Sequence, residues 1–338
     1  MNGSLSLLWF DDPLPMQTED RVPPLSIAVI DIGTNTVLLL IAGVEAGGTL
    51  TTAVYEQRTP RLGRGVDAGG RLHPESMERA VQAVEEFRGI IARRRRDAVA
   101  VFGTSAVRDA QNRDELASLM LARTGFPLEV LSGNDEALWT YRGAISGVPG
   151  IAAATVIDIG GGSTEITSGT GRRVTSSASL NIGSVRLTER LLLHDPPLRR
   201  ETDDARSTIR RALCSAAAAP GSLLVAVAGT ATTLALLAQK RPEFSIEAVS
   251  GYVLPLHTVS ELRASLERRS SRALRGMAPY MEGRHDIITA GALILEEAMV
   301  HFGFERVLVS ERGVRYGVAL REAERVRGRA PEQGKTDQ

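Results

Sequence analysis

The amino-acid sequence predicts an α/β protein built from two related halves. Apolar runs typical of β-strands alternate with segments of helical periodicity along most of the 338-residue chain. The string Val-Ile-Asp-Ile-Gly occurs twice, with its aspartates at Asp31 and Asp158. A repeated string at this separation indicates two units of similar structure, and the chain is long enough for each unit to have its own core.

The first copy of the repeat begins a set of three strands. A buried strand that ends in Asp31 leads into the turn Gly33-Thr34-Asn35-Thr36. An apolar run at 37–42 follows, then glycine turns, and then a β-rich segment at 49–55. The order is strand, turn, strand, turn, strand, whereas a dinucleotide-binding loop would open a helix.

The remaining elements follow in chain order. Apolar spacing predicts helices at 74–91, 112–123, 133–145, 183–193, 201–218, from 229 onward, 257–269, 286–302 and 312–328. It predicts strands at 97–103, 127–131, around 153–180, at 223–228 and at 306–309.

These elements divide into two domains flanked by tails. We expect a loosely ordered tail at 1–24, an N-terminal domain at 25–148 and a C-terminal domain at 149–328, with a hinge near 147–150. The final helix, 312–328, is able to pack back on the first domain. A polar tail occupies 329–338.

The amino-acid composition bears on which kinds of molecule the protein binds. Basic and acidic residues balance at 40 each, so no overall positive field indicates a nucleic-acid or membrane partner. Of the basic residues, 38 are arginine, which fits a GC-rich genome and also the binding of phosphate by planar guanidinium groups. The single cysteine, Cys214, is expected to be a small core residue. No apolar run has transmembrane length and 5–10 is too short for a signal core, so we expect a cytoplasmic protein.

The second copy of the repeat has the chemistry of a phosphate-binding turn. Its sequence is Asp158-Ile159-Gly160-Gly161-Gly162-Ser163-Thr164-Glu165. Glycines allow backbone N–H groups to approach an anion, and the two hydroxyls add donors. The carboxylate of Asp158 is a candidate ligand for a hard cation such as Mg²⁺. A plain glycine-rich surface turn is the alternative, and the repetition of the motif argues against it.

Five strings, in order, resemble one protein family. They are Gly103–Asn112, Ser132–Ala137, Asp158–Glu165, Gly183–Glu189 and Arg284–Ile288. Together, over residues 26 to 322, they resemble the exopolyphosphatase/guanosine pentaphosphate phosphohydrolase (Ppx/GppA) family in its short two-domain form. The paired Asp-Ile-Gly loops are similar to those of the actin/Hsp70/sugar-kinase superfamily. The resemblance implies two actin-like (ribonuclease H-like) domains with an interdomain cleft.

The resemblance also implies roles for individual residues. It makes Glu136 the general base, Asp158 a ligand of Mg²⁺ or Mn²⁺, and Glu165 a second ligand or base, with Asp31 as a third candidate ligand. The substrate-binding candidates are Gly33, Thr34, Asn35, Thr36, Arg108, Gly160, Gly161, Gly162, Ser163, Ser184 and Arg284.

Some of these residues have structural alternatives. The negative charge of Glu136 could stabilise the N-terminus of its helix through the helix dipole. Arg108 could form a surface salt bridge, and Ser184 could simply begin a helix. For Arg284 a structural role and a substrate role remain open.

The expected activity is metal-dependent release of terminal phosphate from inorganic polyphosphate, from guanosine pentaphosphate, or from both. A phosphotransferase with an adenosine pocket near Gly229–Thr233 and a non-catalytic phosphate sensor are the alternatives, and a homodimer remains open. Longer family members carry a further helical C-terminal domain, which we do not expect here. Short polyphosphates or guanosine pentaphosphate should therefore be handled at least as well as long chains.

Overall fold

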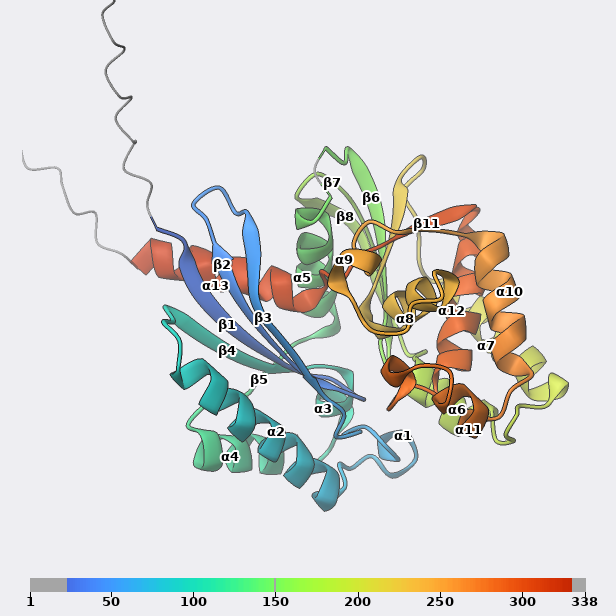
Figure 1. Ribbon diagram of the computed structural model, residues 1–338, viewed down its shortest axis with the longest axis horizontal. Helices are drawn as coiled ribbons and strands as arrows, with labels where there is room; N and C mark the ends of the chain where they lie inside the picture. Colours follow the sequence, from blue (N-terminus) through green and yellow to red (C-terminus); the bar gives the residue numbers. More distant parts are fainter. Residues whose placement is uncertain (1–22, 149, 330–338) are drawn as a thin grey trace, which may run out of the picture.

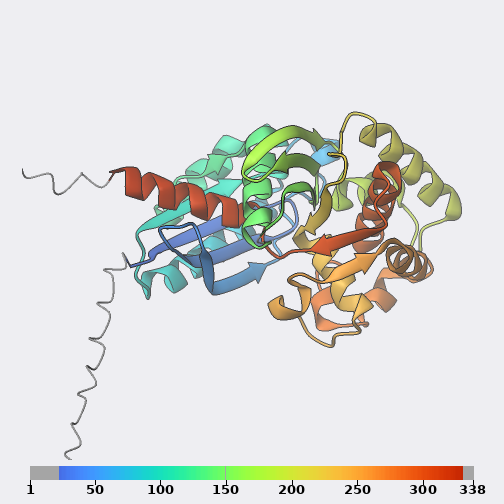
Figure 2. The same cartoon turned by 90° about the horizontal axis from the view of Figure 1, so that it is seen from above.

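Two β-sheets, each flanked by helices, make up the protein (Figures 1 and 2). The computed structural model describes residues 23–148 and 150–329. The predicted tails at 1–22 and 330–338, and residue 149 of the predicted hinge, lie outside the described residues. The α/β prediction is confirmed, since strands and helices alternate along the described chain.

The first sheet has the strand order β3-β2-β1-β4-β5. Strand β1 is antiparallel to β2 and parallel to β4, which is parallel to β5. The strands are β1 (Leu25–Ile32), β2 (Val37–Val44), β3 (Leu50–Arg58), β4 (Ala98–Gly103) and β5 (Glu129–Val130). The helices that follow them are α1 (Val66–Gly69), α2 (Pro74–Ala92), α3 (Ser105–Asp109) and α4 (Arg113–Thr124).

The second sheet repeats this order and adds one edge strand. Its order is β8-β7-β6-β9-β11-β10, and β6 is antiparallel to β7 and parallel to β9. The strands are β6 (Ala153–Ile159), β7 (Thr164–Thr170), β8 (Arg173–Leu180), β9 (Leu223–Val227), β10 (Val253–Pro255) and β11 (Arg306–Val309). The repeated Val-Ile-Asp-Ile-Gly string therefore marks two equivalent strands, β1 and β6, as the sequence predicts.

One face of the second sheet carries most of the helices. Buried apolar residues of α6 (Ser184–Leu191), α7 (Arg199–Leu213), α8 (Ala228–Ala238), α10 (Leu256–Glu267) and α12 (Ile288–Phe302) form a core with this sheet. The short helices α9 (Ile246–Val249), α11 (Ser271–Arg275) and η1 (Pro279–Met281) lie in the loops between them. Among the described residues no helix is both long enough and apolar enough to span a bilayer.

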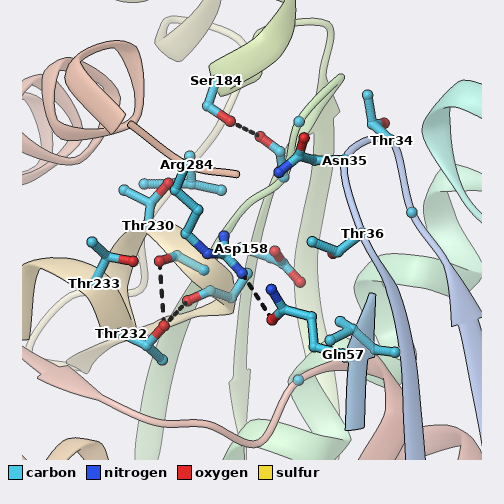
Figure 3. A pocket seen from close by; sticks show the side chains of 18 of the residues that line it. Thr34, Asn35, Thr36, Gln57, Asp158, Ser184, Thr230, Thr232, Thr233 and Arg284 are labelled. Carbon is cyan, nitrogen blue, oxygen red and sulfur yellow. Dashed lines mark hydrogen bonds between the residues drawn. The ribbon is translucent and has the colours of Figure 1, made fainter. Parts of the chain in front are cut away.

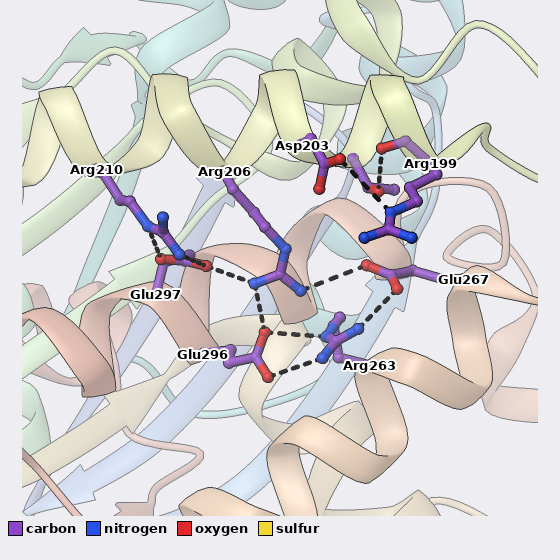
Figure 4. A network of polar contacts seen from close by, with 9 residues as sticks. Arg199, Asp203, Arg206, Arg210, Arg263, Glu267, Glu296 and Glu297 are labelled. Atoms are coloured by element: carbon purple, nitrogen blue, oxygen red, sulfur yellow. Dashed lines mark hydrogen bonds and ion pairs between the residues drawn. The ribbon is translucent and has the colours of Figure 1, made fainter.

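An ion-pair network joins three of these helices (Figure 4). Glu296 and Glu297 are buried neighbours on α12. Glu296 pairs with Arg206 of α7 and with Arg263 of α10, each at 2.9 Å. Glu297 pairs with Arg210 of α7 at 2.6 Å. Because buried carboxylates are costly unless they are paired, this network fixes α7 and α10 on α12.

Helix α7 begins and ends earlier in the chain than the sequence predicts. A helix was expected at 201–218, but it runs from Arg199 to Leu213. Glu201 accepts the backbone N–H of Leu198 at 3.0 Å and so helps begin the helix earlier. Cys214 follows the helix and is exposed, so the prediction that it is a core residue is wrong. The alanine-rich stretch after Cys214 runs over the surface toward β9.

Helices α5 (Gly133–Ser146) and α13 (Val314–Arg329) each pack on the sheet of the other half of the chain. Helix α5 packs on the second sheet, although it precedes that sheet in the chain. Helix α13 is last in the chain and packs on the first sheet, along β1 and β2 (Figure 1). The two helices touch backbone to backbone. A Cβ on Gly317 would lie 1.9 Å from the carbonyl oxygen of Trp139, and one on Gly143 would lie 2.1 Å from that of Gly313.

We therefore expect Gly317→Ala to destabilise the protein. The added methyl group must separate the two helices, and overpacking of this kind costs about 1–3 kcal/mol of unfolding free energy. Gly89→Ala is the matched control, because it also replaces a helical glycine and its new Cβ meets nothing within 4 Å. The control should gain about 0.5–1 kcal/mol from helix propensity. Chemical denaturation of both variants measures the difference, and equal stabilities would contradict the close contact.

Candidate active-site cleft

The two repeated turns have the same local geometry and meet across the cleft. The N–H of Gly33 donates to the carbonyl oxygen of Thr36 at 2.9 Å, and the N–H of Gly160 donates to that of Ser163 at 3.0 Å. A Cβ on Gly161 would lie 2.8 Å from the Cβ of Thr34. Glycine is required at Gly161 because the two halves touch at this point.

A cavity of about 410 Å³ lies between the halves, within the range of small-molecule sites. Figure 3 shows Asn35 and Thr36 of the first turn, Asp158 of β6 and Arg284 around it. The predicted site residues that line the cavity are Asp31, Gly33, Thr34, Asn35, Thr36, Glu136, Asp158, Gly160, Gly161, Gly162, Ser163, Ser184 and Arg284. Two predicted residues, Arg108 and Glu165, are not among the lining residues.

Four carboxyl groups are buried in or directly behind this cavity. Asp31 and Asp158 lie at equivalent positions near the ends of β1 and β6. Glu136 lies in the first turn of α5, and Glu165 pairs with Asp158 in the β6–β7 register. Each is at most 8% exposed. The repeat and the helix start thus bring together side chains that are far apart in the sequence.

Burial raises the pKa of all four groups. It raises the pKa of Asp31 and of Asp158 to about 7, and the negative charge of Glu136 adds to both shifts. Burial, with the charges of Glu136 and Asp158, raises the pKa of Glu165 well above its usual range. Burial also raises the pKa of Glu136, although Arg108 opposes this shift. The cleft therefore favours the binding of a positive charge next to these carboxylates.

The carboxylates differ in their partners. Asp158 Oδ2 accepts a hydrogen bond from the Thr140 hydroxyl at 3.3 Å, and Glu165 Oε1 accepts one from Ser179 at 2.7 Å. Asp31 Oδ1 is buried and has no hydrogen-bond partner among the residues that the structure describes. A buried oxygen without a donor is costly, which makes Asp31 suited to a cation or a water molecule.

Arg108, a predicted substrate ligand, pairs with Glu136 and is not among the residues that line the cavity. It donates to Glu136 Oε2 at 2.7 Å and to the carbonyl oxygen of Leu131 at 3.1 Å. This ion pair is largely buried, so it is not the surface salt bridge that the sequence left as the alternative. Arg108 orients Glu136, and the other carboxylate oxygen of Glu136 has no hydrogen-bond partner among the residues that the structure describes.

The backbone N–H groups at the N-terminus of α6 form hydrogen bonds with the second turn. The N–H groups of Ser184 and Val185 donate to the carbonyl oxygens of Gly160 and Gly161 at 2.9 and 2.8 Å. These backbone donors hold the second turn in place. Ser184 still lines the cavity, and its hydroxyl donates to Gly160 at 3.2 Å.

Polar contacts between the halves lie near the cleft. Arg186 of α6 pairs with Asp67 and, at 2.7 Å, with Asp109 of the first half. Arg61 pairs with Asp286, and the Asn35 side chain donates to the carbonyl oxygen of Gly283 at 2.9 Å. These contacts hold the two turns facing each other.

Comparison with known proteins assigns the chain to a family. The model of the Ppx/GppA phosphatase family matches residues 40–326. The chain belongs to the Ppx/GppA phosphatase family. Exopolyphosphatase 2 of Mycobacterium tuberculosis is 38% identical over 312 residues, which cover 87% of this chain and 97% of that protein. Exopolyphosphatase 1 of Mycobacterium bovis is 30% identical over 302 residues, with 87% of each chain covered.

Solved structures of Ppx/GppA proteins have the same fold. An exopolyphosphatase-like protein superposes with a TM-score of 0.83 at 32% identity, over 89% of this chain and 98% of that one. The Aquifex aeolicus member of the Ppx/GppA family superposes with a TM-score of 0.77 at 29% identity, over 90% and 99% of the two chains. The predicted membership of the Ppx/GppA family and its α/β fold are thus confirmed.

Several residues of this Ppx/GppA cleft were not predicted from the sequence. Tyr55 and Gln57 of β3, Phe244, Tyr280 and Arg315 all line the cavity. The alternation along β3 marks Tyr55 and Gln57 as one face of a strand, but not as the face toward the cleft. The sequence carries no comparable signal for Phe244 or Arg315.

The donor set fits a hard cation with few protein ligands. All the candidate ligands are carboxylate oxygens, the ligand type that Mg²⁺ prefers. Within residues 23–148 and 150–329 no group of three or more His, Cys, Asp or Glu side chains is arranged to hold a metal ion. Mg²⁺ commonly binds one or two carboxylates and completes its shell with water and substrate phosphates. The open arrangement of Asp31, Asp158 and Glu165 is compatible with that mode.

Proposed function

We propose that the protein is a phosphoanhydride hydrolase that releases terminal phosphate from inorganic polyphosphate. The observation that carries the proposal is one cavity lined by the two glycine turns and by three buried carboxyl groups, those of Asp31, Glu136 and Asp158. Phosphoryl transfer needs a positioned water and donors for spreading negative charge more than it needs covalent chemistry. Relatives named exopolyphosphatases, with most of their length covered, support the same substrate class.

Guanosine pentaphosphate is the second candidate substrate. Tyr55 and Phe244 come from opposite halves and stack with ring centroids 5.9 Å apart at the cavity. Leu236, Pro279 and Tyr280 also line this part. A planar base could pack on such a surface while the phosphates reach the turns.

Glu136 is the proposed general base. One of its oxygens accepts the hydrogen bond from Arg108, and the other is available to a water molecule. As the water oxygen bonds to the terminal phosphorus, Glu136 takes the proton and the bridging P–O bond breaks. Backbone N–H groups of the Gly33–Thr36 and Gly160–Ser163 turns would hold the phosphate oxygens.

Mg²⁺ or Mn²⁺ is the proposed cofactor, held by Asp158 and Glu165 with Asp31 as a third ligand. When bound, such an ion would neutralise phosphate charge at the reacting group. The raised pKa values of Asp31 and Asp158, and the unpartnered oxygen of Asp31, support this assignment.

Substrate choice is tested by measuring phosphate release from tripolyphosphate, long polyphosphate and guanosine pentaphosphate in parallel at two ionic strengths. We expect short chains or the nucleotide to be used at least as well as long chains, and the use of long chains to fall steeply with salt. Release from none of the three substrates would refute the hydrolase proposal. A strong, salt-independent preference for long chains would refute only the expected chain-length dependence.

Glu136→Gln should lower phosphate release by about 10²- to 10⁴-fold, as expected when a general base is lost. Asp135→Asn is the matched control, because Asp135 lies in the same helical turn but is exposed and bonds to Ser132. The control should keep nearly full activity. A Glu136→Gln protein with more than half of the wild-type rate would exclude Glu136 from the mechanism.

Removal of metal with a chelator should abolish phosphate release, and added Mg²⁺ or Mn²⁺ should restore it. Added Mg²⁺ should also raise the melting temperature of the wild type more than that of Asp158→Asn, because binding to the native state stabilises it. Full activity in metal-free buffer would contradict the assignment of a metal.

A further inference from the structure

Two arginines in the cleft have no carboxylate within ion-pair distance among the described residues. Arg315, the second residue of α13, is 5% exposed, and its Nη2 donates to the Tyr55 hydroxyl at 3.2 Å. Its Nη1 is buried without a hydrogen-bond partner in the described part of the chain. Arg284 donates through Nη2 to Gln57 Oε1 at 3.3 Å (Figure 3).

Two side chains of strand β3 hold the guanidinium groups of Arg284 and Arg315 at the same cavity. Tyr55 and Gln57 are two residues apart on β3, so their side chains lie on the same face of the sheet. Both line the cavity, as do Arg284 and Arg315. The Cζ of Arg315 lies 4.6 Å from the Tyr55 ring centroid, a cation–π contact that helps to hold the guanidinium in place. Each neutral partner occupies one nitrogen and leaves other N–H groups for a ligand.

This pair of positive charges is unfavourable without an anion. Burial and the nearby charge of Arg315 lower the pKa of Arg284. A buried guanidinium N–H without an acceptor adds a desolvation cost. An anion between the two groups would remove both penalties at once.

The N-terminus of α13 adds donors at the same place. Gly313, Val314 and Arg315 line the cavity. In the described residues no acceptor is found for the backbone N–H groups of Val314 and Arg315. At α6, by contrast, the corresponding groups bind the carbonyl oxygens of the second turn. Free N–H groups and the helix dipole favour an anion at the start of this 16-residue helix.

We propose that Arg315, with Arg284 and the N-terminus of α13, binds a phosphate group of the substrate. The planar guanidinium can contact two oxygens of one phosphate, which a lysine could not do in the same way. The charge of Arg315 acts on Asp31 and Asp158, so this subsite adjoins the carboxylates and holds the chain against them. The identity of the ligand as a phosphate chain rests on the proposed function. A purely structural role for Arg315, as the counter-charge of buried Asp31, is the alternative.

The test is the binding of tripolyphosphate measured by calorimetry in a Glu136→Gln background, which limits hydrolysis during the titration. Arg315→Met should weaken binding by about 10- to 100-fold, as expected for the loss of a charge-assisted hydrogen bond. Arg312→Met is the matched control, because Arg312 does not line the cavity and already donates to Glu311 and to the carbonyl oxygen of Ser146. Its dissociation constant should match that of the background protein.

Arg315→Lys keeps the charge and serves if Arg315→Met fails to fold. It should bind tripolyphosphate several-fold more weakly, because it loses the planar fork. A folded Arg315→Met or Arg315→Lys protein with unchanged affinity overturns the subsite, and so does a Glu136→Gln protein that binds no tripolyphosphate. If binding depends on Arg315 but the wild-type protein releases no phosphate, the subsite stands and the hydrolase proposal fails.

Discussion

Mutual repulsion among four buried carboxyl groups is the constraint on which the cleft depends. Burial raises all four pKa values, and the charge of Glu136 raises those of Asp31, Asp158 and Glu165 further. Only Glu136 has a direct arginine partner, Arg108, among these four in the described residues. The arginines of the same cavity have the opposite imbalance, because Arg284 and Arg315 have no carboxylate within ion-pair distance in the described part of the chain. A ligand that brings a cation to the carboxylates and phosphate oxygens to the arginines would satisfy both groups.

The repeated topology creates this arrangement. Equivalent strands, β1 and β6, end in equivalent aspartates and equivalent turns, so two similar halves present the same chemistry to each other. Glycine at Gly161 lets the turns touch, and the Arg186 and Arg61 ion pairs hold the halves around them. The site is therefore a product of the interface and belongs to neither half alone.

The fold and much of the site lining could be predicted because they depend on local patterns. The repeated string marks Asp31 and Asp158, and the helix start at Ser132 marks the turn that carries Glu136. The pairing of Arg108 with Glu136 could not be predicted, because it depends on how α3 meets α5 in space. The same is true of Arg315, which is brought to the cleft by the return of the last helix to the first sheet.

That return also determines when the first domain can be completed during synthesis. Val314, Tyr316 and Leu320 of α13 cover Ile27 and Val29 of β1, so this face of the first sheet is closed by residues made almost 300 positions later. Until α13 has left the ribosome, the apolar face of the first sheet is not covered by this helix. All the preceding helices and strands have been synthesised by then. The chain cannot be divided near residue 148 into two self-sufficient proteins, because the N-terminal fragment would lack a helix that only the C-terminal fragment encodes. A circular permutant that begins at α13 and continues into β1 would instead make the first domain contiguous.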